Sequence, residues 1–303
     1  MSKRVGVDDF VMISVIGKGA YAKVVLAKHK ATKQVCALKI IKKKKLLKGT
    51  KENLALLEKD ILTRVKHPFM LRLLYCFQTE EKLFFVLEFC PGGELFNLIS
   101  RLQTLSEEHA KFYAAQMLLA LHHMHTHQVV YRDLKPENVL IAHDGYVKIA
   151  DFGLCKRNFL TEEVFSVSGT PEYLAPENLE RRPCSEAIDW WALGSIIYEM
   201  LVGEPPFMAP NREEIFSKIK KEEVRLPPTL SLECQDLLRR LLAKKPGARL
   251  GAKGVEEITG HPWFSKINWD KLLAKEYRAP YVPHLKSELD LSHFDDEFLK
   301  TNV

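Results

Sequence analysis

Three polar residues of different chemistry lie close together in the chain: Asp133, Lys135 and Asn138. Apolar residues flank them on both sides, at 129–130 and 139–141, and should hold the polar loop in place. The carboxylate can accept a proton from a hydroxyl group, the ammonium can neutralise a phosphoryl group, and the amide can bind Mg²⁺. The loop therefore predicts transfer of a phosphoryl group to a hydroxyl group.

A second acidic motif, Asp151-Phe152-Gly153, follows a predicted strand that ends at Ala150. We expect Asp151 to be the second Mg²⁺ ligand and to bridge the β- and γ-phosphates of ATP. Phosphoryl transfer depends on positioning and charge neutralisation more than on covalent help from the protein. ATP and Mg²⁺, with Mn²⁺ as a substitute, are therefore the predicted cofactors.

A glycine-containing turn lies between two predicted strands near the N-terminus. Its residues are Gly17, Lys18, Gly19, Ala20, Tyr21, Ala22, Lys23 and Val24, preceded by Ile16. Glycines let backbone N–H groups approach a polyphosphate closely, so we expect the turn to bind nucleotide phosphates; an ordinary hairpin turn is the alternative. A strand follows it and no Gly-Lys-Ser/Thr is present, which excludes a Rossmann fingerprint and a P-loop. Ala22 replaces the third glycine and should at most reduce ATP affinity.

Lys39 lies inside the apolar strand 35–41, where an unpaired ammonium would be costly. Glu58 lies on the next helical segment, on the side that should pack inward. A Lys39–Glu58 ion pair would direct the lysine onto the α- and β-phosphates of ATP. The alternative is that both residues lie at the surface.

The remaining pattern predicts a small β-rich lobe and a larger α-rich lobe. The predicted strands are 10–13, 24–27, 35–41 and 83–87. The predicted helices are 51–65, 107–124, 188–201 and 232–242, with Ser106 as an N-cap. Pro91-Gly92-Gly93 separates the lobes as a hinge, and residues 279–283 form an extended strap. The cleft between the lobes is the natural ligand site.

Composition is typical of a globular protein and excludes several classes. The 303 residues carry a net charge of +6, and 46% are hydrophobic. No apolar run is long enough to span a membrane, and the N-terminus lacks a signal-peptide pattern. The six cysteines are scattered, which indicates a reducing compartment, the cytosol or nucleus. The lysine-rich run 42–48 is interpreted as a solvated segment rather than a nucleic-acid or lipid site.

The chain resembles the AGC group of eukaryotic Ser/Thr protein kinases over nearly its whole length. The motifs that carry this resemblance are Tyr131 before Arg132-Asp133, and the segments 169–177, 189–194, 249–251, 279–283 and 294–298. Segments 92–96 and 151–156 are most similar to the Akt, SGK and ribosomal-protein kinase branch. The resemblance implies an α+β, bilobal kinase fold with a β-rich N-lobe (1–89) containing a C-helix, a hinge (88–92), an α-rich C-lobe (90–270) and an AGC-type tail (271–303).

The resemblance also implies roles around the nucleotide. Glu88 and Cys90 would bind adenine through their backbone, Leu87 would be the gatekeeper, and Glu94 would also bind the nucleotide. Val24, Ala37 and Leu140 would enclose the adenine ring, and the Phe294 region would cross the cleft. A regulatory spine would consist of Leu62, Leu73, Tyr131 and Phe152, anchored by Asp189. Glu177 would pair with Arg249.

Substrate choice and activation follow from the same resemblance. Glu94, Glu137 and Glu199 would bind arginines upstream of the target hydroxyl group, with structural ion pairs as the alternative role. Ser166 would be phosphorylated by an upstream kinase of the phosphoinositide-dependent type, with Ser168 as a second candidate. The phosphate would bind Arg132 and Lys156. We expect a monomer that acts on Arg-rich protein substrates.

Other interpretations stay open. A pseudokinase is a rival, although the residues needed for catalysis are all present; a small-molecule or lipid kinase and a nucleic-acid binder are less consistent with the motifs. The C-terminal Phe-x-x-Phe-Ser/Thr-Tyr motif of many relatives does not occur before Val303. We expect either a trimmed catalytic domain or activation by another chain's motif.

Overall fold

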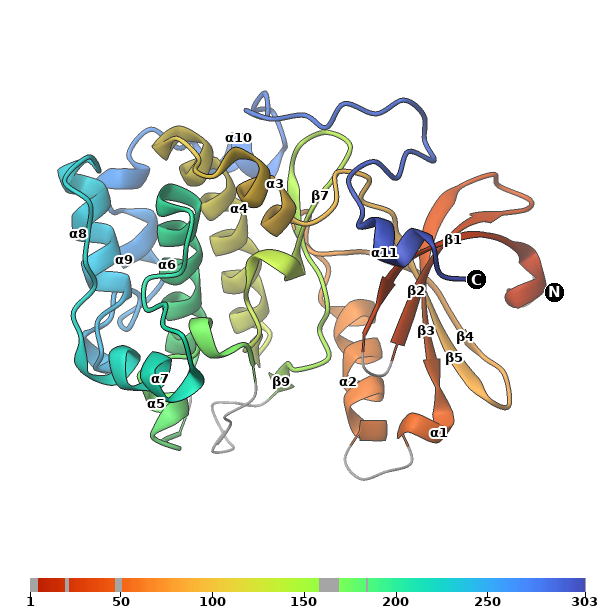
Figure 1. The fold of residues 1–303 in the computed structure, drawn as a ribbon, viewed down its shortest axis with the longest axis horizontal. Coiled ribbons are helices and arrows are strands. Elements are labelled where there is room, and N and C mark those ends of the chain that lie inside the picture. Colours follow the sequence, from red (N-terminus) through yellow and green to blue (C-terminus); the bar gives the residue numbers. More distant parts are fainter. Residues whose placement is uncertain (1–4, 20–21, 47–50, 158–168, 184, 303) are drawn as a thin grey trace.

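The structure is a computed structural model, and it describes residues 5–19, 22–46, 51–157, 169–183 and 185–302. The small lobe contains an antiparallel sheet in the order β1-β2-β3-β5-β4. Its strands are β1 (Phe10–Lys18), β2 (Ala22–His29), β3 (Val35–Lys42), β4 (Leu73–Gln78) and β5 (Lys82–Glu88). Helices α1 (Lys43–Leu46) and α2 (Lys51–Arg64) follow β3, and α2 lies between the sheet and the large lobe (Figure 1).

The sheet register decides which side chains face the cleft. Ala37 of β3 pairs with Leu87 of β5, and Lys39 pairs with Phe85 and Val24. Because side chains alternate between the two faces of a strand, Ala37 and Lys39 lie on the same face. This face is the roof of the cleft between the lobes.

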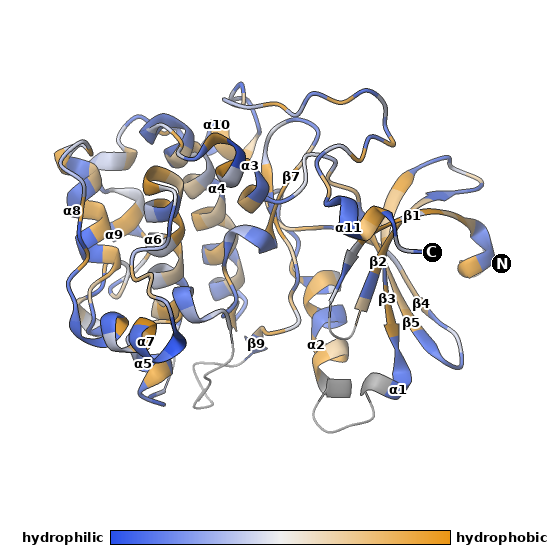
Figure 2. Cartoon of the chain, viewed as in Figure 1, coloured by the Kyte–Doolittle hydropathy of each residue, from blue (hydrophilic) through white to orange (hydrophobic). Residues whose placement is uncertain are grey.

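Helices make up most of the large lobe. They are α3 (Leu95–Leu102), α4 (Glu107–Thr126), α5 (Pro176–Leu179), α6 (Ala187–Val202), α7 (Arg212–Lys221), α8 (Leu232–Leu241), α9 (Glu256–Thr259) and α10 (Trp269–Leu273). Ser106 caps α4 and accepts a hydrogen bond from the His109 N–H at 3.3 Å, as predicted. Every residue of α6 from Ala187 to Leu201 is buried, and Figure 2 shows this helix as mostly hydrophobic, in contrast to α7.

Short strands on the cleft side of the large lobe carry the polar loops. They are β6 (Val129–Val130), β7 (Val139–Ile141), β8 (Val147–Ile149) and β9 (Lys156–Arg157). Strand β6 pairs with β9, and β7 pairs with β8. The two hairpin-like pairings fix both ends of the loop 131–138 and bring residues 151–157 beside it.

The C-terminal segment returns from the large lobe to the small lobe. After α10 it runs as an extended strap along one side of both lobes, and α11 (Asp296–Leu299) lies against β1 (Figure 1). The Lys23 ammonium donates to the carbonyl oxygen of Asn302 at 2.5 Å. No helix among the described residues has the length and apolar character needed to cross a bilayer.

The predicted α+β class and two-lobe architecture are confirmed. One difference from the sequence prediction is β4, which the sequence analysis did not identify, as it did not identify α3 and α7. The β4 residues Leu73, Leu74, Tyr75, Cys76 and Phe77 are all partly buried and show no alternation between buried and exposed positions. Without that period of two, the strand has little local signal.

Candidate active site

The polar loop 131–138 is held by a buried carboxylate from α6. Asp189 accepts hydrogen bonds from the backbone N–H groups of Tyr131 and Arg132, both at 2.9 Å, and it also contacts the imidazole of His125 at 2.8 Å. Arg132 has a φ of 71°, in the left-handed region that is uncommon for a non-glycine residue. The two hydrogen bonds to Asp189 stabilise this sharp turn and so fix the direction of Asp133.

Asp133 and Asn138 face each other across the loop. The Asn138 amide nitrogen donates to the Asp133 carbonyl oxygen at 2.8 Å and to its carboxylate at 2.9 Å. Burial raises the pKa of Asp133 to about 6, although Lys135 and the Asn138 hydrogen bond oppose the shift. A carboxylate with a pKa near neutrality is suited to accept a proton and release it again. Lys135 donates to the Thr170 hydroxyl group at 3.0 Å.

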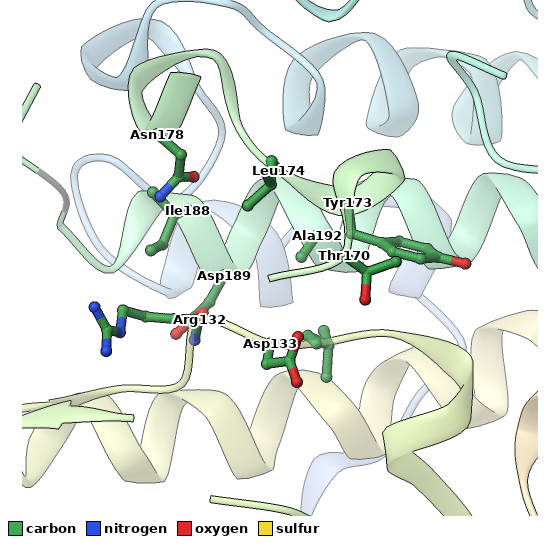
Figure 3. Close-up of a pocket in the computed structure, with 10 residues that line it drawn as sticks. Arg132, Asp133, Thr170, Tyr173, Leu174, Asn178, Ile188, Asp189 and Ala192 are labelled. Atoms are coloured by element: carbon green, nitrogen blue, oxygen red, sulfur yellow. The ribbon is translucent and has the colours of Figure 1, made fainter. Parts of the chain in front are cut away.

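Thr170 belongs to the segment that covers this loop. Figure 3 shows Arg132 and Asp133 on one side of a small pocket, with Thr170, Tyr173 and Leu174 on the other side. The Lys135–Thr170 bond therefore joins the loop to the segment 169–177. A peptide that reaches Asp133 would lie beside this segment.

Lys39, Glu58 and Asp151 form a charged triad at the back of the cleft. The Lys39 ammonium lies 2.6 Å from the Glu58 carboxylate and 2.9 Å from the Asp151 carboxylate. Burial would lower the pKa of Lys39, but the two carboxylates outweigh it and raise the pKa above its ordinary value. Lys39 in turn lowers the pKa of Asp151. The lysine and the aspartate are thus both charged at neutral pH.

The Asp151 side chain is 52% exposed, which leaves its carboxylate open to the cleft. The Asn138 backbone lies beside the residue that precedes Asp151, because the Ala150 N–H donates to the Asn138 carbonyl oxygen at 2.8 Å. The described residues contain no cluster of three or more His, Cys, Asp or Glu side chains able to hold a metal. An amide and one carboxylate nevertheless fit Mg²⁺, which is usually bound by few protein groups together with phosphate oxygens and water.

The cleft contains a cavity of about 180 Å³ above these groups. Most of the predicted nucleotide-binding residues line it: Ile16, Gly17, Val24, Ala37, Lys39, Leu87, Glu88, Cys90, Glu94 and Leu140. Lys18, Gly19, Ala22 and Lys23 instead line a separate cavity that also includes outer residues of the sheet. Ala20 and Tyr21 lie outside the described residues.

Three further residues, to which the sequence analysis gave no site role, line the cleft cavity: Leu71, Phe89 and Ala150. Leu62 and Phe152, predicted as members of the spine, line it as well. Phe89 stacks on Phe294 of the C-terminal strap, with ring centroids 5.6 Å apart, and Phe294 also lines the cavity. The only sequence signal for Phe89 is its place between two predicted hinge residues, Glu88 and Cys90. The side chain of Glu88 binds Lys148 at 2.8 Å.

Buried contacts connect the triad to the polar loop. The Tyr131 hydroxyl group donates to the Ala150 carbonyl oxygen, and its ring meets Phe152 edge-on at 5.8 Å. Leu62 belongs to the same buried cluster, and Leu73 packs against it. Deeper in the large lobe, Glu177 and Arg249 form the buried pair that the resemblance implies, at 2.6 and 2.9 Å.

Carboxylates gather on the large-lobe side of the cleft. Burial and the neighbouring charges of Glu137 and Asp295 raise the pKa of Glu94 to about 7. Burial also raises the pKa of Glu199 to about 7, although the Tyr173 hydroxyl group donates to it at 2.6 Å. Among the described residues, one buried carboxylate oxygen of Glu137 has no hydrogen-bond partner.

One buried carboxylate oxygen of Glu172 likewise has no hydrogen-bond partner among the described residues. The charge of Glu172 also raises the pKa of Glu199. Glu94, Glu137 and Glu199 form an acidic cluster, and Glu172 and Asp295 are additional members of it that the sequence did not predict.

Glu172 belongs to the motif 169–177 and Asp295 to the motif 294–298. The sequence analysis identified both motifs but assigned neither of them a role in this cluster. Carboxylates whose charges raise one another's pKa would gain most from a cationic ligand.

The predicted phosphorylation sites Ser166 and Ser168 lie outside the described residues. Arg132 reaches the start of the same segment: its Nε donates to the Leu154 carbonyl oxygen at 2.6 Å, and Nη2 contacts the Cys155 carbonyl oxygen at 3.5 Å. The described part of the segment is therefore attached to the polar loop by this arginine.

Comparison with known proteins adds independent information. A model described as "Protein kinase domain" matches residues 10–264. "Serine/threonine-protein kinase Sgk1" of Gallus gallus is 45% identical over 294 residues, which is 96% of this chain and 68% of the relative. The Homo sapiens protein of the same name is 44% identical over 98% of the chain and 69% of the relative. "Protein kinase 2" of Dictyostelium discoideum is 43% identical over 96% and 61%.

Proposed function

The chain belongs to the protein kinase family as a Ser/Thr protein kinase of the AGC group, in the SGK branch, and we propose that it phosphorylates Ser/Thr hydroxyl groups in Arg-rich protein sequences. A protein kinase domain uses ATP and a divalent metal, usually Mg²⁺; Mn²⁺ as a substitute is part of the proposal. We also propose that the N-lobe comprises residues 1–89, the C-lobe residues 90–270 and the tail residues 271–303.

The observation that supports the proposed site roles most strongly is the Lys39–Glu58–Asp151 triad. Lys39 of β3 lies 2.6 Å from the carboxylate of Glu58 on α2 and 2.9 Å from that of Asp151, which follows β8. All three side chains line the cavity. In this proposal Lys39 orients the α- and β-phosphates, and Glu58 holds the lysine in that position. Asp151 and Asn138 would hold the metal, which neutralises charge on the phosphates when bound.

Asp133 would then act on the substrate. Its carboxylate accepts the proton of the attacking Ser or Thr hydroxyl group and keeps that oxygen in line with the phosphoryl group. Lys135 would stabilise the negative charge that is transferred. The raised pKa of Asp133 and its hydrogen bond to Asn138 are consistent with this role.

The acidic cluster supports the preference for basic substrates. Glu94, Glu137 and Glu199 would receive arginines that precede the target hydroxyl group, in an Arg-x-Arg-x-x-Ser/Thr-like sequence. Guanidinium groups bind carboxylates in a bidentate manner, and the buried oxygen of Glu137 would gain a partner. Peptides with acidic or proline-directed sequences should be poor substrates.

Activation by phosphorylation of Ser166 is also part of the proposal. The new phosphate would bind Arg132 and Lys156 and so order the segment that ends at Gly169. An upstream kinase of the phosphoinositide-dependent type would add this phosphate. We further propose that the protein acts as a monomer in the cytosol or nucleus.

A radiolabelled-ATP assay on a positional peptide library tests these roles together. The wild type should phosphorylate Arg-containing peptides, and Asp133→Asn should lower kcat by at least about a hundredfold. Asp270→Asn, which changes an exposed aspartate on α10, is the matched control and should retain full activity. Equal turnover by Asp133→Asn and wild type would refute the role of Asp133, and selection of acidic peptides would refute the substrate class.

A further inference from the structure

An ion pair outside the nucleotide cavity joins helix α2 to the segment that follows Asp151. The Asp60 carboxylate, on α2, binds the guanidinium of Arg157, on β9. The two side chains are 28% and 33% exposed, so the contact lies at the edge of the protein interior. Asp60 and Arg157 are 97 positions apart in the sequence, and only the folded chain brings them together.

The backbone that carries Arg157 is attached firmly to the large lobe. Arg157 pairs with Val129 in the β6–β9 ladder, and β6 leads directly into the polar loop that contains Asp133. The Arg132 guanidinium binds the Leu154 carbonyl oxygen a few residues earlier. Arg157 therefore presents its charge from a strand whose position is tied to the catalytic loop.

The helix that carries Asp60 also carries Glu58. Successive residues of an α-helix are about 100° apart around the axis, so residues two positions apart point to different sides. Glu58 points to Lys39 of the small-lobe sheet at 2.6 Å, whereas Asp60 points to β9 of the large lobe. Helix α2 is thus held by one carboxylate in each direction.

We infer that Asp60 and Arg157 are positioning residues that hold α2 in the orientation in which Glu58 reaches Lys39. The inference rests on the proposed role of the Lys39–Glu58 pair in orienting ATP. Losing the Asp60–Arg157 contact frees the helix on its large-lobe side, and the fraction of molecules with an intact Lys39–Glu58 pair falls. The contact thereby couples the position of the catalytic loop to that of the nucleotide.

Helix α2 supplies its own control for this inference. Arg64 binds the same carboxylate of Asp60 at 2.5 Å, but it lies on α2 itself and is 69% exposed. A contact within one helix cannot hold that helix against another element. If Asp60 acted only as a surface charge on α2, then Arg64 and Arg157 would be equivalent partners.

The test is a double-mutant cycle read by steady-state kinetics. Asp60→Asn and Arg157→Gln should each lower kcat/KM for ATP by about two- to fivefold, the range expected for a partly exposed ion pair. The double variant should be no worse than either single variant, because both remove the same contact. Arg157→Lys should retain most activity, and Arg64→Gln should match the wild type.

Hydrogen exchange of residues 54–64 gives a second readout. Exchange should be faster in Asp60→Asn than in Arg64→Gln, with melting temperatures that stay close to the wild type. Additive kinetic effects in the double variant, or equal losses in Arg64→Gln and Arg157→Gln, would overturn the inference. Glu58→Gln distinguishes a failure of the proposed function from a failure of this inference. Full activity of Glu58→Gln would contradict the proposed function. An inactive Glu58→Gln together with a fully active Asp60→Asn would contradict only the role of Asp60.

Discussion

Replacing Glu177 by alanine should destabilise the large lobe strongly, because Arg249 would keep its charge without its carboxylate partner. The two side chains are 2% and 0% exposed, and two charge-assisted hydrogen bonds of 2.6 and 2.9 Å join them. The Arg249 hydrogen bonds to the carbonyl oxygens of Ala187 and Ala243, at 2.7 and 3.1 Å, remain in the variant. They prevent the guanidinium from moving out to solvent.

Removing one partner of a buried ion pair typically costs about 3–5 kcal/mol. The entropy of unfolding is about 2 cal/mol/K per residue, or roughly 0.6 kcal/mol/K for the whole chain. Glu177→Ala should therefore lower the melting temperature by about 5–8 °C, and by more if the large lobe unfolds separately. Scanning calorimetry at neutral pH measures this shift directly.

Glu180→Ala is the matched control for this experiment. Glu180 pairs with Arg182 at 2.9 Å, but these side chains are 36% and 67% exposed. An exposed pair contributes at most about 1 kcal/mol, which corresponds to a shift of less than about 2 °C. Equal melting temperatures of the two alanine variants would show that burial does not set the cost of removing the carboxylate.

Three further outcomes are expected. Lys39→Met should lower kcat/KM for ATP by about a hundredfold or more without weakening peptide binding, since the proposed peptide site lies on the other lobe; product formation and a peptide-binding titration measure the two effects. The kcat/KM for an Arg-containing peptide should rise between about pH 6 and pH 8, because Glu94 and Glu199, each with a pKa of about 7, must lose their protons to bind arginine in the proposed role. A flat profile would contradict this role, and Glu94→Gln should weaken the pH dependence. Gly93→Ala should raise KM for ATP several-fold, because this glycine has a φ of 70° and an added Cβ would lie 2.4 Å from the His293 carbonyl oxygen of the strap; Gly247→Ala, with open space around it, is the control and should leave KM unchanged.

The local parts of the fold could be predicted because their signals lie close together in the sequence. The cap of α4 needs only Ser106 and the residues of the first turn. The strands β1, β2, β3 and β5 carry runs of β-branched and other apolar residues. Strand β4 lacks such a signal: its described residues are all partly buried or exposed, and it becomes a strand by pairing with β5.

The same distinction applies to the site. Asp133, Lys135 and Asn138 could be identified from spacing alone, because one short loop holds all three. Phe89 stacks on Phe294 although the two residues are far apart in the sequence. Glu172 and Asp295 likewise come from separate segments to lie near the other carboxylates. No spacing rule connects such residues, since their proximity depends on how the lobes and the strap pack.

The sequence by itself determined which chemical groups this protein has and the order in which they occur. Carboxylate, ammonium and amide at the right intervals indicate phosphoryl transfer, because that chemistry requires those groups. Only the tertiary structure decided which charges meet beyond the predicted Lys39–Glu58 pair. Lys39 has two carboxylate partners, Asp60 has Arg157, and the pKa values of Glu94 and Glu199 are raised to about 7. Electrostatic interactions depend on distance in space and on burial, and both quantities arise only when the chain folds.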